Sequence, residues 1–209
     1  PRFFVMCAFT FTVFLSLFQL LPTAPYHVIA LGGSTTAAGL FLGLLTYSSA
    51  LSAPFTGIVG DRIGQRRVLF SVSLMLAGFS AAYAFITDYR LLLALVVVHG
   101  FVWSALLTAS GAYITSAIPV ARRAQGLGYW GLASVLSIAL APPLGFWVYQ
   151  WGWKALCVES VILNLCLAVI AWRLPDDRAV EGQATLARRA SGPGPIIEVR
   201  ALVLAIALG

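Results

Sequence analysis

The chain has 209 residues, of which 60% are hydrophobic and 10% are charged, and its net charge is +6 at neutral pH. Soluble domains carry about 25% charged residues, so this composition excludes an ordinary water-soluble protein and indicates one that lies in a lipid bilayer. The basic residues are scattered between apolar runs and do not gather on one soluble surface, which excludes a nucleic-acid-binding protein.

Six apolar runs predict six transmembrane helices, since a helix needs roughly 20 apolar residues to cross a hydrocarbon core of about 30 Å. The predicted helices cover about Phe3–Leu21, Thr35–Gly60, Val68–Thr87, Leu91–Ile118, Leu127–Tyr149 and Ala155–Trp172. The first run could instead be a cleaved signal peptide, but it is too long and lacks a small-residue cleavage site before Pro22. The predicted fold class is therefore an all-α membrane protein, with a six-helix transmembrane bundle over residues 1–174.

The residues after the sixth run have a different composition. Residues 175–200 are rich in proline, glycine and charged side chains, and we expect them to form a polar cytoplasmic linker. Residues 201–209 are apolar again and predict the start of a seventh transmembrane helix. Because the chain opens on Pro1 and stops inside this apolar run at Gly209, we expect it to be truncated.

The basic residues predict which end of the bundle faces the cytoplasm. Apart from Arg90 and Lys154, every one of them falls on a segment that lies inside the cell if the N-terminus is cytoplasmic. The positive-inside rule favours that orientation. We therefore expect a multi-pass protein of the plasma membrane, which in a bacterium is the cell inner membrane, with a cytoplasmic N-terminus.

The first run ends in the segment Leu21-Pro22-Thr23-Ala24-Pro25-Tyr26. Proline has no backbone N–H group, and its ring clashes with the preceding turn of a helix. We therefore expect the two prolines to end the first helix at a defined place near the outer side of the membrane.

A glycine-rich, charged turn, Gly57-Ile58-Val59-Gly60-Asp61-Arg62-Ile63-Gly64-Gln65-Arg66-Arg67, joins the second and third predicted helices. Its glycines permit tight turning, its aspartate can accept hydrogen bonds from free N–H groups at a helix start, and its arginines mark a cytoplasmic face. The turn resembles the signature of the major facilitator superfamily, Gly-x-x-x-Asp-Arg-x-Gly-x-Arg-Arg, at every fixed position.

This resemblance implies a secondary transporter in which two six-helix halves rock around a cavity at the membrane midplane. The chain would then supply the N-terminal half, and its partner would be the missing C-terminal half of the same chain. The resemblance also implies a conformational latch, formed by Gly57, Asp61, Arg62, Gly64, Arg66, Arg67, Arg122 and Arg123. In this latch Asp61 would pair with Arg122 or Arg123 and with a helix N-terminus of the other half, and would stabilise the outward-open state.

Two further stretches resemble the drug:proton antiporter branch of that superfamily. One is the Leu-Pro-x-x-Pro segment at the end of the first run. The other is in the fifth helix and comprises Gly128, Ser137, Ala141, Pro142 and Gly145. These residues follow the branch pattern Gly-x8-Gly-x3-Gly-Pro-x2-Gly, with other small residues in place of two glycines. The alternative is an ordinary kinked packing helix, because glycine and proline are frequent in membrane helices.

The fourth helix departs from the antiporter branch. Val96 stands where an arginine is usual, and His99 stands where a glutamine precedes Gly100. That arginine is a residue often implicated in proton coupling in the branch, so its replacement leaves proton coupling an open question.

Few ionisable side chains lie inside the predicted helices. Apart from tyrosines and cysteines they are His99 and Glu159, and such groups are costly in lipid and are functional candidates by default. His99 could exchange a proton near neutrality or could be a neutral imidazole bonded to a neighbour. Glu159 could take part in coupling or could pair with Lys154. Gln19 and Asn164 could line a cavity or could bond between helices.

The residues that usually hold metals or perform catalysis are sparse. Cys7, Cys157 and Cys166 form no Cys-x-x-Cys pair and there are 2 histidines, so we expect no metal site, no disulfide framework and no cofactor. The chain has no paired carboxylates and no Ser/His/Asp arrangement, so we do not expect an enzyme.

The sequence therefore predicts a secondary active transporter that moves a small organic molecule by alternating access, with efflux by proton antiport as the favoured mode. Its partners would be the transported molecule, protons and the lipid bilayer. The alternatives are a facilitator or symporter for sugars or organic anions, and a non-transporting membrane scaffold or sensor with the same fold.

Overall fold

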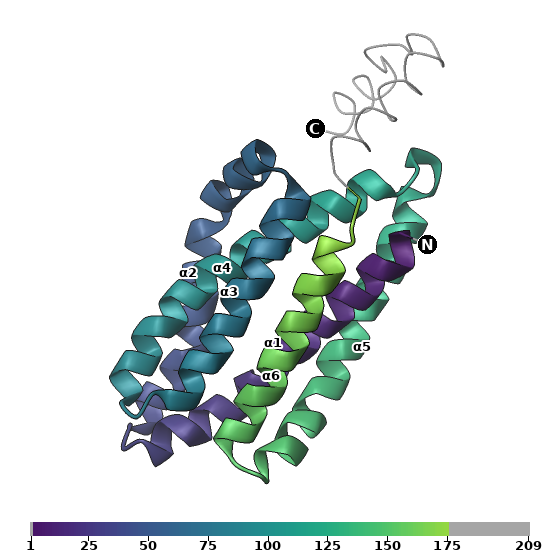
Figure 1. Ribbon diagram of the computed structural model, residues 1–209. Helices are drawn as coiled ribbons and strands as arrows, with labels where there is room; N and C mark the ends of the chain where they lie inside the picture. Colours follow the sequence, from purple (N-terminus) through teal and green to yellow (C-terminus); the bar gives the residue numbers. More distant parts are fainter. Residues whose placement is uncertain (1, 176–209) are drawn as a thin grey trace, which may run out of the picture.

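The computed structural model describes residues 2–175, which form six long helices joined by short turns (Figure 1). They are α1 (Arg2–Ala30), α2 (Thr35–Ile63), α3 (Gln65–Phe85), α4 (Tyr89–Ala117), α5 (Arg123–Tyr149) and α6 (Trp153–Trp172), and a short 3-10 helix, η1 (Val120–Arg122), precedes α5. Each long helix is of sufficient length and hydropathy to cross a membrane. The predicted all-α fold class and the six predicted membrane helices are confirmed, and the described residues contain no strand.

The boundaries of α2 to α6 lie within four residues of the predicted ones. This agreement follows from hydropathy, because each apolar run is bounded by charged residues or by turn residues. The predicted linker beyond Pro175 and the predicted start of a seventh helix, residues 201–209, lie outside the described residues.

The prediction that Pro22 and Pro25 end the first helix is wrong, because α1 continues through both to Ala30. Thr23 lies between them, and its Oγ1 donates to the carbonyl oxygens four and three residues before it, at 2.9 and 3.1 Å. Each proline removes the N–H group that would bond to the carbonyl four residues before it, and the Thr23 hydroxyl bonds to two other carbonyls of the same turn. Beyond the prolines the helix still buries Val28 in the core. Water cannot solvate a broken helix inside lipid, so the helix tolerates the prolines instead of ending there.

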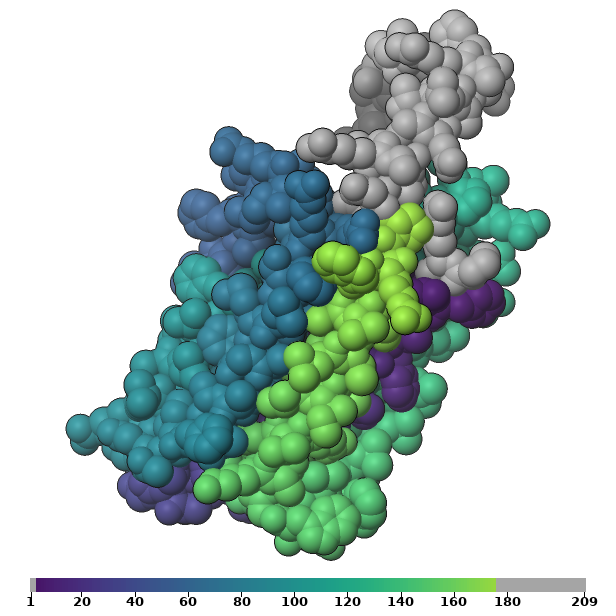
Figure 2. Space-filling view, in the orientation of Figure 1, coloured from purple at the N-terminus to yellow at the C-terminus, as the bar shows by residue number. Residues whose placement is uncertain are grey.

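The six helices form two sets of three, α1 to α3 and α4 to α6, and the two sets have the same pattern of lengths and contacts. In chain order, α1 to α3 have 29, 29 and 21 residues, and α4 to α6 have 29, 27 and 20. The most extensive contacts join α1 to α5, α2 to α4 and α3 to α6, and this pattern is unchanged when the two sets are exchanged. Figure 2 shows α3 and α6 packed together along one face of the molecule. The core therefore lies between the two sets.

Polar turns close both ends of the bundle. Gly64, with φ of 96°, ends α2 and starts α3 in a backbone conformation that favours glycine. At the opposite end, the Asp88 carboxylate accepts a hydrogen bond from the Arg90 N–H at 2.8 Å and caps α4. The α2–α3 turn, η1 and the C-terminal end of α6 lie at the same end of the bundle as the N-terminus (Figure 1). We call it the basic end; it carries Arg62, Arg66, Arg67, Arg122, Arg123 and Arg173.

The outer surface of the bundle is apolar. On α2, the large side chains of Tyr47, Leu51 and Phe55 are 74, 73 and 69% exposed. Apolar surface on this scale marks contact with lipid or with other protein in place of water. Together with the six membrane-length helices, it identifies a multi-pass integral membrane protein.

Candidate functional site

Polar side chains from α1, α3 and α6 meet in the apolar core. The Asn164 Nδ2 of α6 donates to the Ser16 Oγ of α1 at 3.0 Å and to the Ser80 Oγ of α3 at 3.3 Å. All three residues are buried. A buried amide is costly unless it is hydrogen-bonded, so these bonds fix how the three helices sit against one another. The Asn164 Oδ1 has no partner among the described residues.

His99 of α4 lies in the same region and is held by α3. Its Nδ1 is 2.9 Å from the Tyr83 hydroxyl, and its ring stacks on Phe79 with the ring centres 5.3 Å apart. The Tyr83 backbone carbonyl accepts a hydrogen bond from the Trp153 indole N–H at 2.9 Å, which ties this part of α3 to α6. His99 is 3% exposed, and within residues 2–175 its Nε2 has no hydrogen-bond partner.

A small void joins the two polar groups. It measures ≈10 Å³, about the volume that one water molecule needs, and its polar lining comes from Ser16, Ser80, His99 and Asn164. The remaining lining residues are apolar or aromatic, and none is charged. The structure therefore brings two of the predicted candidates, His99 and Asn164, to one place in the core.

The other two candidates lie close to each other on α1 and α6. Gln19 is fully buried, and neither its Oε1 nor its Nε2 has a hydrogen-bond partner among the described residues. The half-buried Glu159 carboxyl lies beside it. Lys154, the alternative partner considered for Glu159, is exposed and forms no ion pair with it in the described part of the chain. Glu159 therefore has the buried Gln19 amide on one side and lines a surface hollow together with Lys154.

Sequence reasoning missed Ser16, Ser80 and Tyr83, which are the hydrogen-bond partners in this region. A serine in an apolar helix carries little signal, because its hydroxyl can bond to a carbonyl of its own helix. Ser80 does this as well, since its Oγ donates to the Leu76 carbonyl at 3.0 Å. Tyr83 precedes His99 by 16 residues on a neighbouring helix, and no local pattern links the two.

The α2–α3 turn holds most of the predicted latch. Gly60 is buried against the Gln65 side chain, and a Cβ atom at Gly60 would lie 2.7 Å from the Gln65 Oε1. The Gln65 Nε2 is 3.5 Å from the Asp61 Oδ1, a long hydrogen bond across the turn. Arg122 of η1 is exposed at the same end of the bundle, and no ion pair between it and Asp61 occurs among the described residues.

The remaining latch residues divide between α2, α3 and α5. Gly57 faces α4, since a Cβ atom there would meet the Thr108 methyl group at 3.8 Å. Arg62, Arg67 and Arg123 are exposed. Apart from Gly57, which lies further inside α2, the latch residues are at the basic end, but the structure does not join them into one ion-paired network within residues 2–175.

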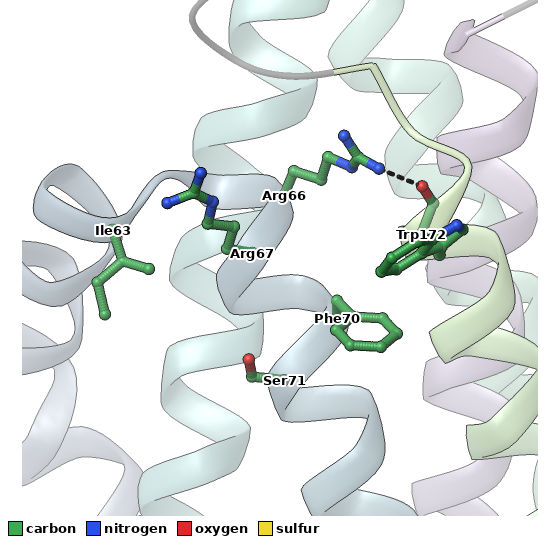
Figure 3. A pocket seen from close by; sticks show the side chains of 6 residues that line it. All are labelled: Ile63, Arg66, Arg67, Phe70, Ser71 and Trp172. Carbon is green, nitrogen blue, oxygen red and sulfur yellow. Dashed lines mark hydrogen bonds between the residues drawn. The ribbon is translucent and has the colours of Figure 1, made fainter.

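Arg66 makes a contact that the sequence did not predict. Its guanidinium donates to the Trp172 backbone carbonyl at the end of α6, and its Cζ lies 6.0 Å from the centre of the Trp172 ring (Figure 3). Phe70, one turn further along α3, packs on the same ring with the ring centres 5.4 Å apart. A carbonyl at a helix C-terminus attracts cations, which explains why an arginine lies there.

The antiporter-like stretch of α5 packs on α1. The Ser137 hydroxyl donates to the Phe11 carbonyl at 2.7 Å, and Ala141 is fully buried. A Cβ atom at Gly145 would lie 2.7 Å from the Gln19 backbone oxygen, so the two backbones touch there.

The other two positions of the stretch lie outside this close contact. Pro142 is half-buried, next to Ala141. Gly128 is exposed, and nothing lies within 4 Å of a Cβ atom built on it. Three of the five predicted positions therefore form the α1–α5 contact.

The contact between α2 and α4 is equally close. A Cβ atom at Gly100 would lie 1.9 Å from the Ser48 Oγ and 2.6 Å from the Leu45 backbone oxygen. Further along the same pair of helices, the Thr56 hydroxyl is 3.2 Å from the Ser104 hydroxyl. Under exchange of the two helix sets this contact corresponds to that of α5 with α1, so a glycine sits at the crossing point in each.

The described part of the chain brings no three His, Cys, Asp or Glu side chains together in a way that could hold a metal ion. The cysteines lie apart: Cys157 is buried, Cys7 is half-buried and Cys166 is exposed.

A comparison with known protein families agrees with the six-helix architecture of the described residues. Residues 4–208 match the profile of the Major Facilitator Superfamily. The chain belongs to this superfamily of membrane transporters. The superfamily signature found in the sequence corresponds to the α2–α3 turn. The prediction from that signature, that the chain is a member of the superfamily, is confirmed.

Several superfamily members with curated names are similar to the chain. The fatty acid resistance protein FarB of Neisseria gonorrhoeae is 25% identical over 68% of this chain and 28% of its own length. The multidrug export protein EmrB of Escherichia coli strain K12 is 25% identical over 59% of this chain and 25% of its own length. A chloramphenicol resistance protein of Pseudomonas aeruginosa is 30% identical over 79% of this chain and 40% of its own length. The chain thus spans only 25 to 40% of the length of these relatives.

Proposed function

We propose that this chain is the N-terminal half of a transporter that exports a small organic molecule by alternating access in exchange for protons. The observation that carries the proposal is the membership of the superfamily, together with similarity to proteins named for multidrug export and for resistance to fatty acids and chloramphenicol. In such a transporter each half moves largely as a rigid body. The close helix contacts at Gly100 and Gly145 suit that behaviour.

We further propose that the basic end faces the cytoplasm. Most of the described arginines gather there with Asp61, while Arg90 and Lys154 lie at the opposite end. The positive-inside rule then favours an orientation with the N-terminus inside, and we propose that the membrane is the plasma membrane. In this orientation the predicted latch lies on the cytoplasmic side, where a second half of the transporter would close against it.

A transport assay on the full-length protein tests this proposal. Inverted membrane vesicles would be incubated with fluorescent dyes and drugs, with and without an imposed pH gradient. We expect accumulation of at least one amphipathic compound that collapses when the gradient is removed. Transport that persists unchanged without the gradient would favour a facilitator, and absence of transport across a broad panel would favour a scaffold or sensor.

Asp61→Asn is expected to reduce transport by at least about fivefold, the lower end of the range for coupling between two states. The amide keeps the size of the side chain but loses the charge that would pair with arginines and with a helix N-terminus in the latch. The measurement is initial uptake into vesicles, normalised to the amount of protein inserted in the membrane. Asp88→Asn removes the same charge at the opposite end and keeps a good helix cap, so it should transport normally. Equal rates for Asp61→Asn and the parent would refute the latch.

His99→Gln is expected to flatten the pH dependence of transport while substrate binding is largely kept. We propose His99 as the proton-responsive group of this half, because its Nε2 has no hydrogen-bond partner among the described residues and the ring lines a void with room for one water molecule. Glutamine retains a donor and an acceptor but cannot titrate. The measurement is uptake across a pH series.

Tyr83→Phe is the matched control for this variant. It removes the 2.9 Å hydrogen bond to the His99 Nδ1 but leaves a titratable ring in place. We expect its pH profile to shift without flattening. If His99→Gln and the parent gave superimposable pH profiles, His99 would be a structural hydrogen-bonding residue.

A further inference from the structure

A pocket of ≈440 Å³ opens at the basic end, over the start of α3 and between the ends of α2 and α6. It is lined by Ile63, Arg66, Arg67, Phe70, Ser71 and Trp172 (Figure 3). In Figure 3 Arg67 and Ser71 extend from α3 on the side of Ile63, and Arg66 and Phe70 extend from it on the side of Trp172. The pocket therefore has a cationic rim and an apolar interior with one hydroxyl.

The charged residues that line this pocket are both basic. None of its lining residues is acidic, and Asp61, the one described carboxylate at the basic end, lies across the turn beside Gln65. Arg66 is positioned by the Trp172 carbonyl and ring. Arg67 is exposed and makes no hydrogen bond or ion pair with any residue that the structure describes. An anionic ligand would therefore meet the guanidinium group of Arg67, whose charge no described residue neutralises.

The depth of the pocket suits the headgroup region of a bilayer. It lies at the ends of two membrane-spanning helices, where Trp172 is 63% exposed. Tryptophan is enriched at the level of the headgroups, and basic pockets between membrane helices bind anionic headgroups. The planar guanidinium group matches the oxygen atoms of a phosphate, while the rings of Phe70 and Trp172 can contact the glycerol and the upper acyl chain.

We propose that this pocket binds the phosphate headgroup of an anionic phospholipid from the leaflet at the basic end. A free phosphate ion would use the arginines but would leave the apolar interior unfilled, which is why the structure favours a lipid. The bound lipid would bridge α3 and α6 beside the α2–α3 turn. A ligand that binds only the folded protein stabilises it, so the lipid should raise the melting temperature of the transporter.

The test uses the full-length transporter purified in a mild detergent and titrated with phosphatidylglycerol or with zwitterionic phosphatidylcholine. Bound lipid is counted by native mass spectrometry, and Tm is followed in parallel. We expect phosphatidylglycerol to bind and to raise Tm, and phosphatidylcholine to do neither at the same mole fraction. Arg67→Gln should weaken phosphatidylglycerol binding about tenfold, the scale of one lost charge-assisted hydrogen bond.

Two further variants separate a site from diffuse surface charge. Arg123→Gln removes an equal charge from the same end of the bundle, outside the pocket, and should change binding less than about twofold, because exposed charges are screened by solvent and salt. Ser71→Leu keeps every charge but fills the pocket, and should weaken binding as much as Arg67→Gln does. Because Ser71 is exposed, leucine there should not disturb folding.

Three results would overturn the proposal. Equal losses in Arg67→Gln and Arg123→Gln would indicate general electrostatic attraction, and full binding by Ser71→Leu would place the lipid elsewhere. Competition by soluble glycerol 3-phosphate at the same concentration as the lipid would show that the pocket takes a soluble phosphate and not a membrane lipid.

Discussion

Gly100→Leu should prevent the bundle from folding stably. A Cβ atom at this position would lie 1.9 Å from the Ser48 Oγ and 2.6 Å from the Leu45 backbone oxygen. The hydroxyl could rotate away, but the backbone oxygen can move only if α2 moves away from α4. Overpacking a core costs about 1–3 kcal/mol when side chains can adjust, so we expect a loss of at least about 3 kcal/mol in the free energy of unfolding.

The measurement is the yield of monodisperse full-length protein on size-exclusion chromatography, together with Tm. Gly111→Leu is the matched control, because it adds the same side chain to the same helix where nothing lies within 4 Å of a Cβ atom. Gly100→Ala alone should lower Tm, and adding Ser48→Gly should restore part of that loss. The second substitution removes the Ser48 hydroxyl from the path of the new methyl group, but the Leu45 backbone oxygen remains. A normal Tm for Gly100→Leu would show that α2 and α4 are not packed as closely as the structure has them.

The number and type of helices could be predicted because lipid imposes strong rules on sequence. Each span must be long and apolar, and charged residues accumulate where the chain leaves the membrane. The prolines of α1 were misjudged because a rule learned from water was applied inside lipid. Pro22 and Pro25 would end a helix whose freed backbone groups water could solvate. In the membrane no water is available to those groups, and α1 continues through both prolines to Ala30.

The sequence predicted some of the polar residues in the core but not the residues to which they are hydrogen-bonded. His99 and Asn164 were recognised because imidazole and amide side chains are costly in lipid and seldom occur there without a role. Their partners, Ser16, Ser80 and Tyr83, belong to residue types that are common in membrane helices. Which of many serines meets an asparagine depends on how three helices cross, and that information is spread over all of their contacts.

The latch shows the limit of reasoning from a motif. The signature turn identified the superfamily from a short stretch of sequence, since every fixed position was filled. The same stretch did not reveal that Arg66 contacts Trp172, which is the last residue of α6 and 106 residues later in the chain. It also did not determine the partners of Asp61, because the proposed latch involves a second half of the transporter.

Gly145→Ala is expected to separate α5 from α1, and Gly145→Leu to abolish stable folding. A Cβ atom at Gly145 would lie 2.7 Å from the Gln19 oxygen and 2.9 Å from the Gln19 Cα, both of which are backbone atoms that cannot rotate away. We therefore expect Gly145→Ala to lower the free energy of unfolding by about 1–3 kcal/mol and Gly145→Leu by more. Thermal unfolding of the purified full-length protein measures both losses.

Gly128 provides a control within the same antiporter-like stretch. It is exposed, a Cβ atom there would meet nothing within 4 Å, and Gly128→Leu should leave Tm unchanged. The comparison distinguishes two explanations of the stretch, because both glycines match the antiporter pattern but only Gly145 lies at a helix crossing. If Gly128→Leu folds normally and still impairs transport, the stretch has a role in transport beyond packing. If Gly128→Leu also transports normally, only the α1–α5 contact explains why small residues occur at Ser137, Ala141 and Gly145, and the case for an antiporter based on α5 fails.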